Sequence, residues 1–262
     1  MAVKLEGNCS VRDMREGAPI VSGTLSIWPQ IGRHAGAEAI SLRVLEFEPG
    51  LSPGVGNEGA DEVIYFLDRL NGSEPDLRRA TVFIDGWSFE IGPQTGIYLR
   101  PGQTFTVNNL NSEPIIFVSS QCPEPQNEIG FVDSLISPKA GSREAERIPI
   151  VRLVDRESIP TADRWYRVLV DDEVGSLQVT QFVGSIPPGR APDHFHNYEE
   201  VLFILRGEGL MRAGEAVSPI GPGSCVYLPK RQVHCVENTG SDELRLLGCF
   251  YPAGSPSARY ES

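Results

Sequence analysis

Three of the chain's four histidines lie near one another in sequence, together with a carboxylate, in an arrangement that could bind a metal ion. His194, His196 and Glu200 occur in the run PPGRAPDHFHNYEEVLFILRGEG, and His234 occurs in GPGSCVYLPKRQVHCVENTG. Because side chains alternate between the faces of a strand, the first three, all at even positions, can point to one side if the backbone between them stays extended or loops gently. His234 must then arrive from a later strand. Three imidazole nitrogens and one carboxylate oxygen suit a borderline divalent cation.

This ligand set leaves room for chemistry at the metal. Four protein ligands on a metal that prefers six leave two neighbouring positions for water, substrate or dioxygen, whereas a closed structural zinc site usually contains cysteine. We therefore expect one divalent transition metal per chain, with iron favoured over manganese, nickel, zinc or copper. Metal affinity should fall below about pH 6, where imidazoles become protonated. The fourth histidine, His34, is interpreted as a surface or core residue.

Six further residues are candidates for contacting a substrate: Leu202, Ile204, Arg206, Arg190, Tyr227 and Gln181. The two aliphatic residues share the strand face of Glu200 and should form an apolar pocket behind the metal. Either arginine could hold a substrate carboxylate through paired hydrogen bonds, with a solvated surface arginine as the alternative. The tyrosine and the glutamine are candidate proton donors or orienting groups. No residue is assigned as a catalytic acid or base.

A frame of glycine and proline surrounds the four candidate ligands and resembles the two paired motifs of the cupin superfamily. The matching positions are Gly189, His194, His196, Glu200, Gly207, Gly223, Pro229, His234 and Asn238. Gly189 and His194 are one residue closer than usual, and Arg231 stands where the family usually has a glycine. The resemblance covers roughly residues 150–262 and implies a small double-stranded β-helix barrel with a metal site. It does not define the reaction, because such folds host many chemistries.

An internal repeat predicts two such barrels in tandem. The segment LRVLEFEPGLSPGVGNEGADEVIYFL matches LQVTQFVGSIPPGRAPDHFHNYEEVLFIL in its order of strand, Pro-Gly turn, loop, acidic residue and strand. We expect an N-terminal barrel over residues 1–130, a linker over 131–150 in which SREAER forms a short helix, and a C-terminal barrel over 151–262. Asn71-Gly72 is a turn signal within the first barrel.

The first barrel lacks the imidazoles of the second. Glu62 falls opposite Glu200, but the positions of His194, His196 and His234 are taken by Gly56, Glu58 and either Thr106 or Phe105. Two glutamates alone make a poor site for a borderline metal. The N-terminal barrel is therefore predicted to be metal-free and to pack against the other barrel, shape its mouth or form a dimer surface.

The composition supports an all-β fold and excludes several classes of function. With 27 Gly and 21 Pro in 262 residues, many short turns are expected rather than long helices. A net charge of −12 argues against binding to nucleic acid or to anionic membranes. Five cysteines without CxxC spacing favour free thiols in a reducing compartment. No apolar run has the length of a signal peptide or a membrane span, so a cytoplasmic protein is expected.

Three functions remain open from the sequence. The first is a mononuclear metal oxidoreductase of dioxygenase type that acts on a small, oxygen-rich metabolite. The second is a redox-neutral metal-dependent isomerase, lyase or hydrolase of a sugar acid or ureido compound. The third is a small-molecule-binding cupin without catalysis. We rank them in this order and expect a homodimer in each case, because pairing through barrel edges would cover exposed strands.

Overall fold

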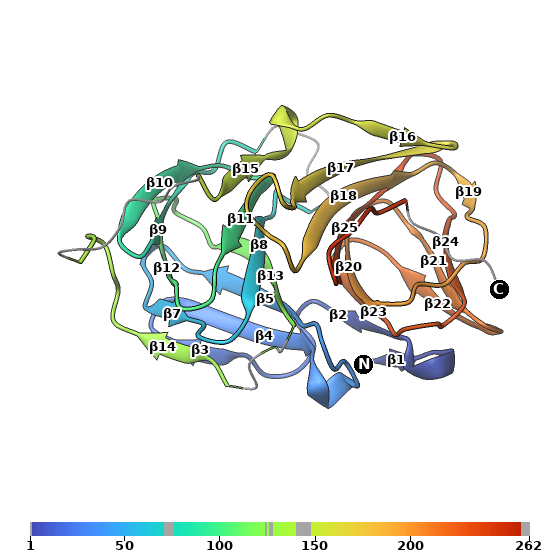
Figure 1. Cartoon of the computed structure of the whole chain (residues 1–262), viewed down its shortest axis with the longest axis horizontal. Coiled ribbons are helices and arrows are strands. Elements are labelled where there is room, and N and C mark those ends of the chain that lie inside the picture. The colour runs from blue at the N-terminus through green and yellow to red at the C-terminus, as the bar shows by residue number, and fades with distance from the viewer. Residues whose placement is uncertain (1, 71–75, 124, 126–127, 140–147, 258–262) are drawn as a thin grey trace.

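The computed structural model describes all residues except 1, 71–75, 124, 126–127, 140–147 and 258–262. It shows two β-barrels side by side, with the N-terminal half of the chain in one and the C-terminal half mainly in the other (Figure 1). The predicted all-β fold with two tandem barrels is confirmed. The predicted SREAER helix and the Asn71-Gly72 turn lie outside the described residues. Within the described part of the chain, no helix is long and apolar enough to cross a bilayer.

The first barrel consists of two sheets. Its strands are Ile20–Ser22 (β3), Leu25–Ile31 (β4), Leu42–Phe47 (β5), Gly50–Leu51 (β6), Gly54–Gly56 (β7), Asp61–Phe66 (β8), Ala80–Ile84 (β9), Trp87–Ile91 (β10), Thr95–Leu99 (β11), Thr104–Asn109 (β12), Ile115–Cys122 (β13), Gly130–Val132 (β14) and Ile150–Arg152 (β15). One sheet has the order β15-β11-β8-β13-β5-β4-β3. The other has the order β10-β9-β12-β7-β14, with β6 paired to β12.

The second barrel repeats this arrangement. Its strands are Val3–Lys4 (β1), Ser10–Asp13 (β2), Ile159–Thr161 (β16), Arg164–Val170 (β17), Thr180–Ile186 (β18), Gly189–Arg190 (β19), Glu199–Arg206 (β20), Gly209–Ala213 (β21), Ala216–Ile220 (β22), Ser224–Leu228 (β23), His234–Asn238 (β24) and Leu244–Tyr251 (β25). The larger sheet has the order β1-β2-β23-β20-β25-β18-β17-β16, and the smaller has the order β19-β24-β21-β22. Short 3-10 helices occur at Glu6–Asn8 (η1), Arg33–Ala35 (η2) and Leu153–Asp155 (η3).

The two barrels exchange edge strands, which departs from the boundaries expected from the sequence. β2, near the N-terminus, pairs with β23 of the second barrel, and β15 pairs with β11 of the first. β14 extends into the predicted linker and pairs with β7 of the first barrel. Alternation of side chains predicts that a segment is a strand but not which sheet it joins. Each exchanged strand covers an edge that would otherwise be open.

Apolar side chains form three clusters: one inside each barrel and one between the barrels. β20 contributes to two of them. Leu202 and Ile204 face the interior of the second barrel, whereas Phe203 and Leu205 belong to the cluster between the barrels. Both faces of this strand are therefore buried, which explains its continuous apolar run. The five cysteines are buried and unpaired, as expected.

Candidate metal centre

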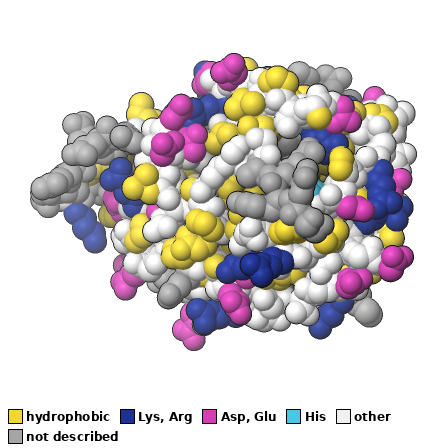
Figure 2. All heavy atoms as spheres, turned by 45° about the vertical axis from the view of Figure 1, so that its right-hand side comes forward, with side chains coloured by type: hydrophobic (Ala, Val, Ile, Leu, Met, Phe, Trp, Pro, Cys, Tyr) yellow, Lys and Arg dark blue, Asp and Glu magenta, His cyan; other side chains and the backbone are white. Residues whose placement is uncertain are grey.

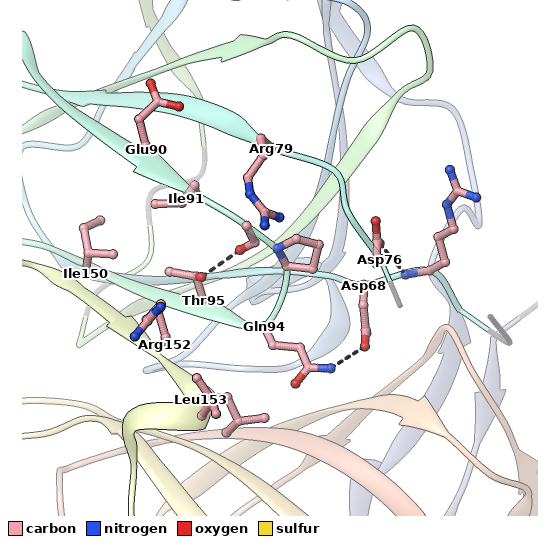
Figure 3. Close-up of a pocket in the computed structure, with 14 residues that line it drawn as sticks. Asp68, Asp76, Arg79, Glu90, Ile91, Gln94, Thr95, Ile150, Arg152 and Leu153 are labelled. Carbon is pink, nitrogen blue, oxygen red and sulfur yellow. Dashed lines mark hydrogen bonds between the residues drawn. The ribbon is translucent and has the colours of Figure 1, made fainter. Parts of the chain in front are cut away.

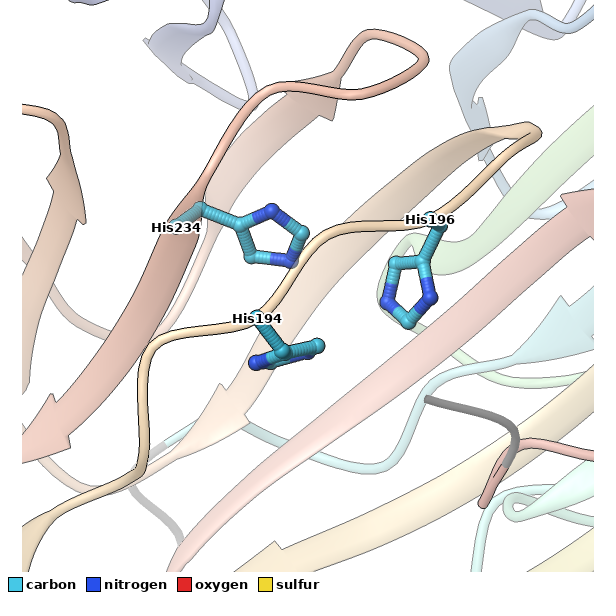
Figure 4. Close-up of side chains that lie close together, drawn as sticks. All are labelled: His194, His196 and His234. Carbon is cyan, nitrogen blue, oxygen red and sulfur yellow. The ribbon is translucent and has the colours of Figure 1, made fainter. Parts of the chain in front are cut away.

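His194, His196 and His234 lie together in the second barrel with their rings directed toward one another (Figure 4). One nitrogen atom from each of the three rings lies within 4.8 Å of one nitrogen atom from each of the other two. His194 and His234 face each other across an isolated antiparallel bridge, with backbone N to O distances of 3.0 and 2.9 Å. His196 follows on the same segment, between β19 and β20. The structure therefore brings together the three predicted imidazoles.

Backbone carbonyls orient two of the rings. Nδ1 of His194 lies 3.1 Å from the Pro192 carbonyl oxygen, and Nδ1 of His234 lies 2.8 Å from the Gln232 carbonyl oxygen. A ring that donates its Nδ1–H keeps a lone pair on Nε2, which is the form that binds a metal. His196 has a buried Nδ1 without a hydrogen-bond partner. These donors fit a divalent cation.

Burial favours the neutral form of His234. Its pKa is lowered to about 4, first because the ring is removed from water and second because His194 lies beside it. Metal ligation requires a neutral imidazole, so this ring needs no deprotonation near neutral pH.

Glu200 lies beside the histidines on the second position of β20. Its Oε2 is 3.2 Å from Nε2 of His196, and the residue is 6% exposed. Neighbouring strands hold it from both sides, because Glu200 pairs with Leu228 on β23 and with Phe250 on β25. The compact donor group among the described residues contains the three histidines without this carboxylate. Its role as the fourth ligand stays a prediction.

A cavity of about 120 Å³ adjoins the histidines and Glu200. Its walls are mainly apolar and include Trp165, Tyr166, Phe182, Ile186, Leu202, Leu228, Val236 and Leu246. In the space-filling view toward the second barrel, a histidine is visible at the surface near hydrophobic side chains (Figure 2). The cavity is far smaller than the roughly 300–1,000 Å³ of pockets for drug-sized ligands. It therefore suits a small metabolite.

Of the predicted substrate residues on β20, Leu202 lines this cavity, while Ile204 lies farther along the same inner face. Arg206 does not share this inner face. The pairing of β20 with β25 shifts between Ile204 and Arg206, and this bulge leaves the arginine exposed. Strand parity fails at a bulge because one extra residue reverses the faces that follow.

The other three predicted substrate residues also lie outside the cavity lining. Arg190 is exposed and forms an ion pair with Asp193 at 2.9 Å. Tyr227 belongs to the cluster between the barrels, because its neighbours on β23 are the residues that face inward. Gln181 is fully buried on β18, and its side-chain oxygen lies beside Gly96 of the first barrel.

Arg164 is a polar cavity residue that the sequence did not single out. It begins β17, and its Nε donates to Asp163 Oδ1 at 3.1 Å. The side chain is 16% exposed, so its charge stands at the cavity while remaining solvated in part. The sequence RWYRVLV did not predict that Arg164 faces the cavity. Alternation separates the two faces of β17, but no residue in this strand showed which face points inward.

Glu199, next to Glu200 but on the opposite face of β20, joins the two barrels. Its carboxylate accepts hydrogen bonds from the backbone N–H of Glu38 at 3.0 Å and of Ala39 at 2.8 Å. The Tyr227 hydroxyl also lies 3.0 Å from it. Glu199 is 3% exposed. Through this carboxylate, the Glu38–Ala39 segment is hydrogen-bonded to the residue next to Glu200, the candidate metal ligand.

Replacing this carboxylate should loosen the junction. In Glu199→Ala, two partly buried N–H groups and the Tyr227 hydroxyl lose their acceptor, and we expect a loss of roughly 1–2 kcal/mol in the free energy of unfolding. Glu199→Gln keeps an acceptor oxygen and should lose less. Urea unfolding measures both, with the exposed Glu215→Ala as a control that should change by less than about 0.5 kcal/mol. Equal stability of Glu199→Ala and the unmodified chain would contradict this role.

The first barrel contains the counterpart of this site without its histidines. Glu62 pairs with Leu99 and Gln121 as Glu200 pairs with Leu228 and Phe250, which supports the expected correspondence. Val55 pairs with Phe105 where His194 pairs with His234. Phe105, rather than Thr106, is thus the equivalent of His234 in the first barrel. Val55 is the equivalent of His194, whereas the sequence repeat assigned that position to Gly56, one residue later.

An arginine lies beside the carboxylate of the first barrel. Arg43 Nη2 is 2.5 Å from Glu62 Oε1 and 3.0 Å from Ser119 Oγ, and Gln121 Nε2 donates to Glu62 Oε2 at 2.9 Å. The guanidinium supplies the positive charge that a metal would supply beside Glu200. This gives a physical basis to the prediction that the first barrel holds no metal.

Comparisons with known proteins agree with this geometry. A family model described as "Cupin domain" matches residues 182–250. Two solved structures of variants of Bacillus subtilis oxalate decarboxylase superpose with TM-scores of 0.74 and 0.72, at 15% and 16% identity. They cover 93% and 92% of this chain and 77% and 76% of theirs. Residues 182–250 therefore match a cupin domain, and the chain as a whole has the two-barrel fold of these solved structures.

Two curated relatives match only parts of this chain. The uncharacterized protein MJ1618 of Methanocaldococcus jannaschii is 37% identical over 54 residues, which are 21% of this chain and 43% of the relative. Auxin-binding protein 1 of Arabidopsis thaliana is 30% identical over 83 residues, which are 28% of this chain and 42% of the relative. The matched stretches thus span less than half of each relative.

Proposed function

We propose that this bicupin is a mononuclear metal-dependent enzyme of dioxygenase type, acting on a small, oxygen-rich metabolite in the cavity of the second barrel. His194, His196, His234 and Glu200 would hold the metal, with iron expected. When bound, the metal would supply redox chemistry and open positions for substrate oxygens and dioxygen.

The character of the cavity lining carries this proposal. Apart from Glu200, the described lining residues include no carboxylate and no lysine. Tyr166 is the phenol in the wall, and it offers a hydroxyl group but no carboxylate or amine. An isomerase or hydrolase needs a positioned group that moves protons. An apolar cavity instead excludes water and suits chemistry in which dioxygen is the co-reactant.

A lyase is the second candidate, and Arg164 is the observation that favours it. An arginine in the lining of a small apolar cavity can bind a carboxylate through paired hydrogen bonds. The oxalate decarboxylases that share this fold act, by their name, on a small dicarboxylate. A carboxylate substrate would therefore be compatible with either reaction. A binding protein without catalysis remains the third candidate.

Oxygen uptake with metal-loaded protein distinguishes these candidates. We would present oxalate, small keto acids and enediols, and measure dioxygen consumed, carbon dioxide released and substrate lost. Stoichiometric dioxygen consumption supports the dioxygenase, and substrate loss without net consumption of dioxygen supports the lyase. Ligand binding without turnover of any substrate would favour the binding protein.

Arg164→Gln should weaken the use of any carboxylate substrate identified in this way. Loss of a charge-assisted hydrogen bond corresponds to roughly a 10- to 100-fold lower kcat/KM. The matched control is Arg212→Gln, whose guanidinium pairs with Glu237 away from the cavity lining. An unchanged kcat/KM in Arg164→Gln would show that this arginine does not contact the substrate.

A further inference from the structure

A second cavity lies between the two barrels, apart from the candidate metal centre. It has a volume of about 440 Å³, and no residue of its lining also lines the metal cavity. The first barrel contributes Tyr65, Asp68, Arg69 and Gln94, and the second contributes Arg206 and Arg245 among others. We call this cavity the interbarrel pocket. Contacts between domains are a common place for small-molecule sites.

Arginines make the interbarrel pocket locally basic on an acidic chain. Three guanidinium groups, those of Arg69, Arg206 and Arg245, belong to its lining, against the carboxylates of Asp68 and Glu208. Arg69 pairs with Glu113 and Arg245 pairs with Glu243, and neither glutamate lines the pocket. Arg206 is exposed and belongs to no ion pair among the described residues, and it interacts with the Glu243 carboxylate only electrostatically. The pocket thus offers positive charge that the protein does not fully neutralise there.

Tyr65 gives the interbarrel pocket a buried hydrogen-bond donor. Its side chain is 1% exposed, and the residue belongs to the lining of the pocket. Asp68 and Arg245, both in the lining, act electrostatically on this phenol. Burial raises the pKa of Tyr65, so the group remains a neutral donor. A neutral phenol hydroxyl can donate one hydrogen bond to a ligand.

A larger hollow of about 680 Å³ adjoins the interbarrel pocket and shares Asp68, Arg69, Gln94 and Leu153 with it (Figure 3). Gln94 Nε2 donates to Asp68 Oδ2 at 2.6 Å on this shared wall. The larger hollow also contains Arg79 and Arg152, but Asp76 and Glu90 balance them, and Arg152 is exposed and paired with Asp155. Its charges are therefore more evenly balanced than those of the interbarrel pocket.

We propose that the interbarrel pocket binds a small metabolite bearing an oxyanion, as in a carboxylate or a phosphate, with Arg206 and Arg245 on the oxyanion and the Tyr65 hydroxyl donating to it. Guanidinium groups match the geometry of both kinds of oxyanion. The occupant would bridge the barrels, because its partners come from both. Arg245 also lies 5.5 Å from the ring of Trp165, which lines the metal cavity.

Calorimetric titration of the full chain, freed of metal with a chelator and dialysed, tests this site. The probes are inorganic phosphate and citrate, and they distinguish a phosphate site from a carboxylate site. We expect one equivalent of at least one probe to bind per chain, more weakly at high salt. Arg206→Gln and Arg245→Gln should each weaken binding about tenfold, and Tyr65→Phe by several-fold.

Two control variants show whether the probe binds in the interbarrel pocket or elsewhere on the chain. Arg100→Gln removes an exposed arginine outside the pocket and should leave probe affinity unchanged. His194→Ala should also leave it unchanged, because the proposed site does not depend on the metal or on the proposed enzymatic function. The proposal is overturned if neither probe binds, or if Arg206→Gln, Arg245→Gln and Tyr65→Phe, shown to be folded by urea unfolding, bind as well as the unmodified chain.

Discussion

His194→Ala should abolish stoichiometric metal binding while the chain remains folded. The ring supplies one of three nitrogens grouped within 4.8 Å, and its Nδ1 is oriented by the Pro192 carbonyl. Loss of a residue that only orients a ligand typically costs about 10- to 100-fold in metal affinity, so loss of a ligand should cost at least about 100-fold. Elemental analysis by mass spectrometry of protein purified without chelator or affinity-column metal measures the effect.

His34→Ala is the matched control for this experiment. His34 lies in η2 of the first barrel, outside the histidine group, and its removal should leave metal content unchanged. The unmodified chain should contain about one equivalent of iron, manganese, nickel or copper. Zinc alone would favour the redox-neutral enzyme, and two equivalents would contradict a metal-free first barrel. Full metal content in His194→Ala would refute the assignment of the site.

Strand alternation explains why much of the second barrel could be predicted from its sequence. A period of two requires Glu200, Leu202 and Ile204 to share a face, and the structure places the two aliphatic residues in the inner cluster. The histidines converge although their segment is a bridge and a bend rather than a long strand. Pairing of His194 with His234 supplies the geometry that a regular strand was expected to supply.

Features that depend on contacts between distant segments could not be predicted. The bulge after Ile204 removes Arg206 from the inner face, and no residue type near Ile204 predicts a bulge there. Tyr227 and Gln181 face the other barrel, and a sequence gives no signal for which face of a strand meets a second domain. The exchange of β2 and β15 between barrels has the same origin. Each concerns a long-range partner rather than a local pattern.

The first barrel shows how an arginine can take the place of an absent metal. Arg43 is 4% exposed and Glu62 is 2% exposed, so both charges are removed from water. Arg43→Met would leave the carboxylate buried without a cation, with Ser119 and Gln121 as its remaining partners. We expect a loss of about 3–5 kcal/mol in the free energy of unfolding, because an unpaired buried charge is strongly unfavourable. Urea unfolding, followed by circular dichroism, measures it.

Removing both charges of the Arg43–Glu62 pair distinguishes the effect of breaking the pair from the cost of burying its charges. The double variant Arg43→Met with Glu62→Leu should recover most of the stability lost in Arg43→Met, since replacing a whole buried pair by apolar side chains is often neutral or stabilising. Arg15→Met is the control. Arg15 belongs to a pair with Glu46 in which its side chain is 50% exposed, and such a pair contributes about 0–1 kcal/mol. If Arg43→Met is as stable as Arg15→Met, the Arg43 guanidinium does not compensate Glu62, and the charge at this position of the first barrel needs another partner.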